Sequence, residues 1–184
     1  MIPAIILAAG ASRRLGRPKQ LVELEGESLL RRAARAALAG CAPVLVVVGS
    51  RAGDMTANLA GLPVTVIGNP AWEEGMASSI RAGIQALPPG AAGVLFMVCD
   101  QIAVDGALVR RLLEAWRDHP DAVIACGYAG TRGTPSIFPA RSFPELLELQ
   151  GDRGARGLLQ GEAVVVPFPE GEADVDVPED LPRD

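Results

Sequence analysis

Residues 2–19 read IPAIILAAGASRRLGRPK, an apolar run that passes directly into a basic loop containing glycine. Residues 2–8 have the length and the branched apolar side chains of a central strand that is buried on both faces. The loop therefore leaves the carboxyl end of this strand, the edge where open α/β sheets bind their ligands. The stretch predicts an α/β fold with a ligand site beside its first strand.

The loop has the features of a phosphate-binding segment. Gly10 and Gly16 allow backbone conformations and close approaches that a Cβ would block, so that N–H groups can point at anionic oxygens. Positive charge comes from Arg13, Arg14, Arg17 and Lys19. We expect a nucleotide as the ligand, and a solvated basic connection is the alternative that the loop alone leaves open.

Two commoner nucleotide-binding loops do not fit this spacing. A P-loop requires Gly-Lys followed by Ser or Thr, but Gly16 is followed by Arg17 and Pro18, and the residue directly after Lys19 is neither Ser nor Thr. The Rossmann pattern GxGxxG would need a second glycine where Ser12 stands.

Short apolar runs alternate with amphipathic segments along the rest of the chain. The expected strands are residues 3–8, 43–48, 64–67, 93–98, 122–126 and 163–166. The expected helices run from Ser28 to Ala39, from Ser50 to about Leu59, over 76–87, and from Asp105 to a point before Pro120. This alternation predicts a three-layer, doubly wound, mostly parallel sheet of the Rossmann-like kind. Residues 135–139 are expected to add a short edge strand that could run antiparallel.

The composition indicates one domain, residues 1–184, because 184 residues of which 49% are hydrophobic suffice for one core. The net charge is -5 and basic residues outside the first loop are scattered, which argues against nucleic acid as a partner. Three cysteines that never form CxxC favour reduced thiols and a cytoplasmic protein. No signal-peptide pattern and no apolar run of ~20 residues is present, so we expect no membrane association.

Four segments resemble the motifs of one family. The first loop is similar to the L-x-x-G-x-S-x-R-x-G-x-x-K loop of nucleotidyltransferases, and within them of the molybdenum cofactor cytidylyltransferases (MocA/MobA-like). Residues 69–80 resemble that family's N-P-x-W-x-x-G-M-x-x-S-[LIV] segment, residues 151–156 its G-D-x-G-A-R, and residues 174–180 its D-[IV]-D-x-P-E-D. The four motifs occur in the family's order from residue 7 to residue 180.

The resemblance implies a set of nucleotide-binding residues: Leu7, Ala8, Ala9, Gly10, Ser12, Gly16, Gly75 and Ser79. It also implies Asp100 and Asp176 as ligands of Mg²⁺, with Mn²⁺ as a substitute. Asp100 ends the apolar run 94–99, which brings its carboxylate to the same sheet edge as the first loop. Mg²⁺ needs only one or two carboxylates beside substrate phosphates. A turn-capping aspartate is the alternative for Asp100.

The implied reaction is the transfer of CMP from CTP to molybdopterin with release of pyrophosphate. The attacking phosphate oxygen is already ionised, so no general base is required, and the single histidine, His119, is expected to end a helix. Arg14 and Lys19 would be the catalytic residues, because they would stabilise charge on the reacting phosphates. A molybdenum hydroxylase would receive the product.

Several positions depart from the family's pattern. Ile102 replaces the proline of D-Q-P, Thr134 replaces the histidine of G-H-P, and Val22-Glu23-Leu24 lacks a proline. These departures affect the acceptor side, so a sugar phosphate or methylerythritol phosphate remains an alternative acceptor. GTP as the donor and a non-catalytic cofactor-binding accessory protein are further alternatives. Ala9 stands where guanylyl-transferring members have glycine, which favours CTP.

Overall fold

The N-terminal apolar run forms the central strand β1 (Ala4–Ala8). In the computed structural model, which describes residues 1–12 and 15–172, β1 pairs in parallel with β4 (Val44–Val48) and with β6 (Gly93–Val98). Every β1 residue except Leu7 is buried, because helices cover both faces of the strand. The prediction of a doubly covered first strand is confirmed.

The main sheet has seven strands in the order β5-β4-β1-β6-β8-β7-β9. Its remaining members are β5 (Thr65–Gly68), β7 (Val123–Tyr128), β8 (Thr131–Pro139) and β9 (Ala163–Pro167). Among the described strands of this sheet, only β8 runs antiparallel to its neighbours, so the expected mostly parallel sheet is confirmed. A separate small hairpin joins β2 (Glu23–Leu24) to β3 (Glu27–Ser28).

The position of β8 corrects the expectation of an edge strand. It lies between β6 and β7 rather than at the border of the sheet. Proline normally confines a strand to an edge because it cannot donate to the ladder. Here the pairing with β7 shifts register between Ala125 and Cys126, which leaves Thr134 and Pro135 without partners on that side. The bulge is what allows Pro135 inside a sheet.

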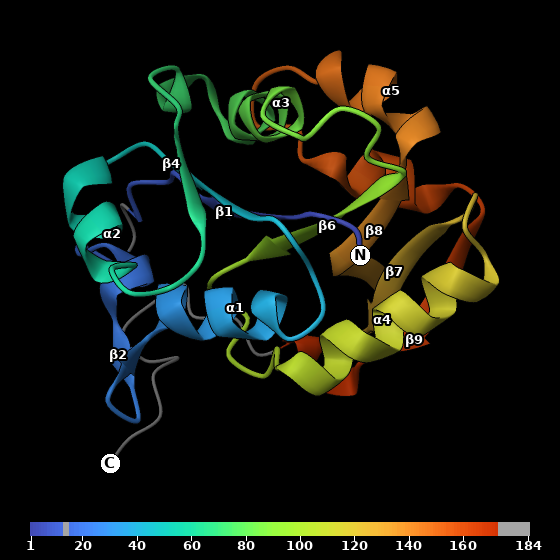
Figure 1. Cartoon of the computed structure of the whole chain (residues 1–184), viewed down its shortest axis with the longest axis horizontal. Helices are drawn as coiled ribbons and strands as arrows, with labels where there is room; N and C mark the ends of the chain where they lie inside the picture. The colour runs from blue at the N-terminus through green and yellow to red at the C-terminus, as the bar shows by residue number, and fades with distance from the viewer. Residues whose placement is uncertain (13–14, 173–184) are drawn as a thin grey trace.

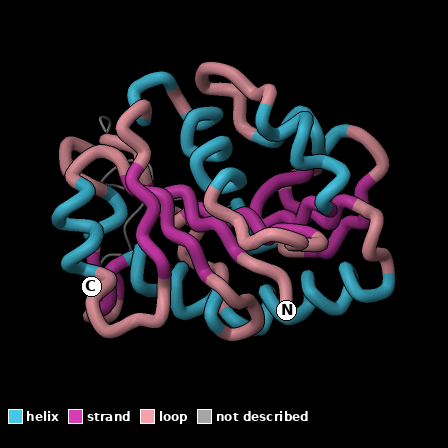
Figure 2. The backbone as a smooth tube through the Cα atoms, turned by 45° about the horizontal axis from the view of Figure 1, so that its top comes forward, coloured by secondary structure: helices cyan, strands magenta, loops and turns pink. Residues whose placement is uncertain are grey.

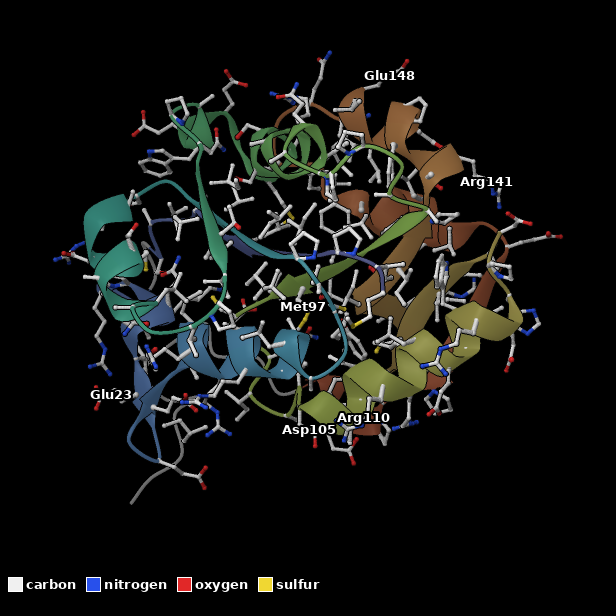
Figure 3. All side chains as sticks on the ribbon, in the orientation of Figure 1. Glu23, Met97, Asp105, Arg110, Arg141 and Glu148 are labelled. Atoms are coloured by element: carbon white, nitrogen blue, oxygen red, sulfur yellow. The ribbon has the colours of Figure 1, made fainter. Side chains whose placement is uncertain are left out.

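The helices form two layers, one on each face of the sheet (Figure 1). Helices α1 (Leu29–Leu38), α2 (Ala52–Asn58) and α4 (Gly106–Asp118) pack on one core cluster, and α3 (Met76–Gln85) and α5 (Phe143–Leu147) on the other. Figure 2 shows the strands between these layers. In Figure 3 Met97 lies inside the molecule, whereas Glu23, Arg141 and Glu148 point outward. The predicted three-layer fold is confirmed.

Of the three helix N-caps predicted from the sequence, Ser28, Ser50 and Asp105, the structure confirms the first and the third. Ser28 accepts a hydrogen bond from the Arg31 amide at 3.2 Å, and Asp105 accepts one from the Leu108 amide at 2.8 Å. The expected Ser50 cap is wrong, because α2 starts after Arg51, which has φ +55° and no capping side chain. Short 3-10 turns are η1 (Lys19–Leu21), η2 (Trp72–Glu74), η3 (Ala140–Ser142), η4 (Ala155–Gln160) and η5 (Pro169–Glu172).

The connections define where a ligand would bind. From β1 the chain continues to β4 on one side, and it later adds β6 on the other side of β1. Such a reversal opens a crevice at the carboxyl ends of the two strands where the order diverges. The first loop and Asp100 both leave the sheet at this point. Across the part of the chain that is described, no helix has the length and hydropathy needed to span a membrane.

Candidate active site

A cavity of about 390 Å³ lies at the carboxyl ends of β1 and β6, and we call it the first cavity. Residues expected from the sequence that line it are Leu7, Ala9, Gly10, Lys19, Gly75, Ser79 and Asp100. Ala8, Ser12 and Gly16 do not line it. Arg14 and Asp176 lie outside the described residues. The structure therefore brings together three separate predicted segments in one crevice.

An ion pair joins the first loop to the end of β6. Lys19 Nζ donates to Asp100 Oδ2, and the two side chains are only 22% and 15% exposed. The other carboxylate oxygen, Asp100 Oδ1, is buried, and no described residue hydrogen-bonds it. A buried oxygen of this kind requires a partner, and a cation can supply one. The Asp100 carboxylate therefore fits a metal ligand that is held close to a lysine.

The described residues contain no group of three or more His, Cys, Asp or Glu side chains that could hold a metal ion.

Gln20 fixes the conformation of the first loop, a role that the sequence did not indicate. Its side chain is 1% exposed, and Nε2 donates to the carbonyls of Ala8 at 3.0 Å and Gly10 at 2.8 Å. Ser12 Oγ donates to Gln20 Oε1 at 3.3 Å and accepts from the Lys19 amide at 3.0 Å. Ala8 and Ser12 thus hold the loop in place behind the first cavity.

The segment that contains Gly151 and Asp152 packs against the start of α3. The Ala77 amide donates to the Gly151 carbonyl at 3.0 Å. Gly75 has φ +110°, and a Cβ on it would lie 2.5 Å from Asp152 Oδ1 and 2.5 Å from the Gly151 carbonyl oxygen. Asp152 lines the first cavity, so this packing brings a further carboxylate into the site beside Asp100.

Gly75→Ala should destabilise this corner of the site, because the new Cβ meets backbone and the φ value is strained for any L side chain. We expect the free energy of unfolding to fall by about 1–3 kcal/mol and nucleotide affinity to weaken. Chemical denaturation and nucleotide titration measure both effects. Gly53→Ala in α2 is the matched control, since its Cβ would meet nothing within 4 Å. Equal behaviour of the two variants would contradict the packing argument.

Asn69 organises the serines at the start of α3. It is 5% exposed, and its Nδ2 donates to Ser78 Oγ at 2.9 Å and to Ser79 Oγ at 3.0 Å. Ser78 in turn donates to the Gly75 carbonyl at 2.8 Å and supports the first turn of the helix. Ser79 accepts from Asn69, so its own proton can be donated to a ligand in the first cavity.

Trp72 and Cys99 also line the first cavity, and both are held by close packing with the rest of the protein. Trp72 packs tightly over Gly49, where a Cβ would lie 2.5 Å from Trp72 Cβ, and it also lines the first cavity. Cys99 is buried, which raises the pKa of its thiol to about 12, with Asp100 adding to the rise and Lys19 opposing it. Burial therefore favours the protonated form of the Cys99 thiol.

Sequence comparison shows a similarity that covers most of the chain. A model of the family described as "MobA-like NTP transferase domain" matches residues 4–166. The chain is 32% identical over 169 residues to the nicotine blue oxidoreductase of Paenarthrobacter nicotinovorans, covering 86% of this chain and 81% of that protein. It is 33% identical over 189 residues to the molybdenum cofactor guanylyltransferase of Rhodobacter capsulatus, covering 99% and 94% of the two chains.

Weaker identity links it to the molybdenum cofactor cytidylyltransferase of Escherichia coli strain K12, 25% over 184 residues, with 98% and 93% of the two chains covered. Among solved structures, Rv0371c of Mycobacterium tuberculosis H37Rv superposes with a TM-score of 0.81 and 29% identity, covering 98% of this chain and 95% of that chain. A structure of the same protein in complex with manganese gives a TM-score of 0.78 and 28% identity, covering 97% of this chain and 95% of that chain. These relatives differ in their named activities, so similarity alone leaves base and acceptor open.

Proposed function

The chain belongs to the family of MobA-like NTP transferase domains and is a nucleotidyltransferase, and from this premise we propose that it transfers CMP from CTP to molybdopterin. The observation that carries the proposal is the meeting of Lys19 with Asp100 in the first cavity, at the reversal of strand order. The family model covers residues 4–166, which supports treating the whole chain as one nucleotidyltransferase domain.

The chemistry requires charge neutralisation and positioning more than proton transfer. An ionised phosphate oxygen of the acceptor forms a bond to the α-phosphorus, and the bond to pyrophosphate breaks with its electron pair leaving on pyrophosphate. Lys19 would stabilise the negative charge that gathers on these oxygens, together with Arg14, which lies outside the described residues. Gln20 would hold the Gly10 backbone in the conformation that receives the nucleotide.

We assign the metal to Asp100, with Asp176 as a proposed second ligand outside the described residues. The buried Oδ1 of Asp100 supports this assignment, and so does the complex of the Mycobacterium tuberculosis relative with manganese. When bound, Mg²⁺ would neutralise charge on the phosphate oxygens of the substrate. Asp100 would also keep Lys19 close to those oxygens through its Oδ2.

Base recognition is assigned to the wall formed by Ala9, Gly75 and Ser79. Ala9 is 6% exposed and lines the first cavity, so its methyl group forms part of the wall that a base would contact. A fixed methyl group favours the smaller pyrimidine ring. The Ser79 hydroxyl would donate to an acceptor on the base edge.

GTP is the second candidate donor, because the identity to the Rhodobacter capsulatus guanylyltransferase is 33% and that to the Escherichia coli cytidylyltransferase is 25%. Pyrophosphate release with molybdopterin as acceptor should be measured for CTP, GTP and ATP under identical conditions. We expect the highest kcat/KM for CTP, since a wrong base would leave polar groups unpaired at about 1–3 kcal/mol each. A kcat/KM for GTP equal to or above that for CTP would overturn the choice of base but not the transfer reaction.

We further propose that the enzyme works in the cytoplasm and passes its product to a molybdenum hydroxylase. The three cysteines of the chain, Cys41, Cys99 and Cys126, are all free and buried, which suits a reducing compartment. Retention of Lys19 and Asp100 together favours an enzyme over an accessory protein that only carries the cofactor.

A further inference from the structure

The charged residues that line the first cavity are one ion pair and two further carboxylates. Lys19 and Asp100 form the pair. Asp152 lies against Gly75, because a Cβ on Gly75 would be 2.5 Å from Asp152 Oδ1. The other carboxylate, Glu73, is an exposed residue of the turn η2.

The Asp152 carboxylate makes no hydrogen bond or ion pair with any described residue, although it lines the cavity. Charges of the same sign repel each other within a few ångström, so this carboxylate opposes a triphosphate placed beside it. The phosphates of a nucleotide are therefore best placed at Lys19. Asp152 is left to face an uncharged part of the nucleotide that can donate a hydrogen bond to it.

Arg81 on α3 holds the segment that carries Asp152. Its Nη1 donates to the Leu149 carbonyl at 2.6 Å, three residues before Asp152 in the chain. Its Nη2 donates to Glu74 Oε2 at 2.8 Å, and Glu74 directly precedes Gly75. Both sides of the contact between Asp152 and Gly75 are thus tied to one guanidinium, so the carboxylate is presented from a fixed backbone.

Asp152 and Ser79 offer opposite hydrogen-bonding groups in the same cavity. An ionised carboxylate only accepts, whereas Ser79 Oγ already accepts from Asn69 Nδ2 at 3.0 Å and has its proton left to donate. Cytosine matches this pair, because its N4 amino group donates and the neighbouring N3 accepts. Uracil has the reverse pattern, with an accepting O4 and a donating N3–H.

We propose that Asp152 is a specificity-determining residue, whose carboxylate accepts a hydrogen bond from the exocyclic amino group of the donor base and so excludes UTP. This inference rests on the proposed function and adds a contact to the wall of Ala9, Gly75 and Ser79. With UTP, the O4 oxygen meets the carboxylate with no proton between them, and both acceptors lose a partner. Ala9 selects for the size of the ring, and Asp152 selects for its polar edge.

Calorimetric titration of the full chain with CTP and with UTP, each with Mn²⁺, tests the proposal. Asp152→Asn keeps the size of the side chain and replaces one oxygen by an NH₂ group, which can donate to O4 of uracil. Glu73→Gln is the matched control, because Glu73 lines the same cavity and its substitution removes the same charge. Loss of one negative charge strengthens the binding of both triphosphates alike and leaves the ratio of their Kd values unchanged.

We expect the wild type and Glu73→Gln to bind CTP about tenfold more tightly than UTP, and Asp152→Asn to bind the two within about twofold of each other. The factor is moderate because Asp152 is an exposed residue, where water competes for the bond. Equal Kd values for CTP and UTP in the wild type would overturn the proposal. An unchanged ratio in Asp152→Asn would overturn it too, since Asp152 would then contact the ribose that both nucleotides share. A wild type that binds neither nucleotide would refute the proposed function, and this inference with it.

Discussion

Asp100→Asn should lower kcat for nucleotidyl transfer by about 10³-fold or more while leaving the fold intact, because it removes the carboxylate proposed to hold the metal. The substitution also removes the negative charge that pairs with Lys19, and it replaces one of the two carboxylate oxygens by an amide NH₂ group, which cannot bind a cation. Pyrophosphate release measures the effect, and the melting temperature reports on the fold. Wild-type enzyme should be inactive in EDTA and regain activity with Mg²⁺ or Mn²⁺.

The matched control for this variant is Asp54→Asn. Asp54 is an exposed aspartate of α2 that is also ion-paired, to Arg51 at 2.7 Å. Its replacement should leave kcat unchanged, since exposed ion pairs contribute little. Undiminished turnover in EDTA would contradict the metal assignment directly.

Lys19→Ala should lower kcat by about 10²-fold or more, the usual effect of losing one preorganised contact to charge that develops in the transition state. Lys19 lines the first cavity and reaches Asp100, whereas Arg17 is exposed. Arg17→Ala is therefore the control and should retain nearly full activity. Initial rates at saturating CTP measure both variants. Similar losses in the two would mean that the loop acts as a diffuse basic patch.

Much of the fold could be predicted because its signals are local. A buried parallel strand is apolar along its whole length, and a capped helix begins at Ser28 or Asp105 by a contact three residues away. The place of β8 could not be predicted in this way. A proline in a strand indicates an edge unless a bulge accommodates it, and the bulge depends on the register with β7, which no local pattern specifies.

The residues of the candidate site likewise fall into those that the sequence could predict and those that it could not. Lys19 and Asp100 were predictable because the ends of adjacent parallel strands meet at one sheet edge. The roles of Gln20, Asn69 and Asp152 were not, since each depends on contacts made in the folded chain. Gln20 reaches back to the Ala8 carbonyl, twelve residues away, and a buried glutamine has no sequence signature. Arg14 and Asp176 remain predictions.

The central claim is that the first cavity transfers a nucleotidyl group at the α-phosphorus. CTP labelled at its α-phosphate should be incubated with molybdopterin and Mg²⁺, and the label followed in acceptor and pyrophosphate for the wild type and Asp100→Asn. We predict that the wild type moves the label to the acceptor, one for each unlabelled pyrophosphate released, and that Asp100→Asn moves almost none. Label in the acceptor at equal rates for both proteins, or none with any phosphorylated acceptor, would contradict this account.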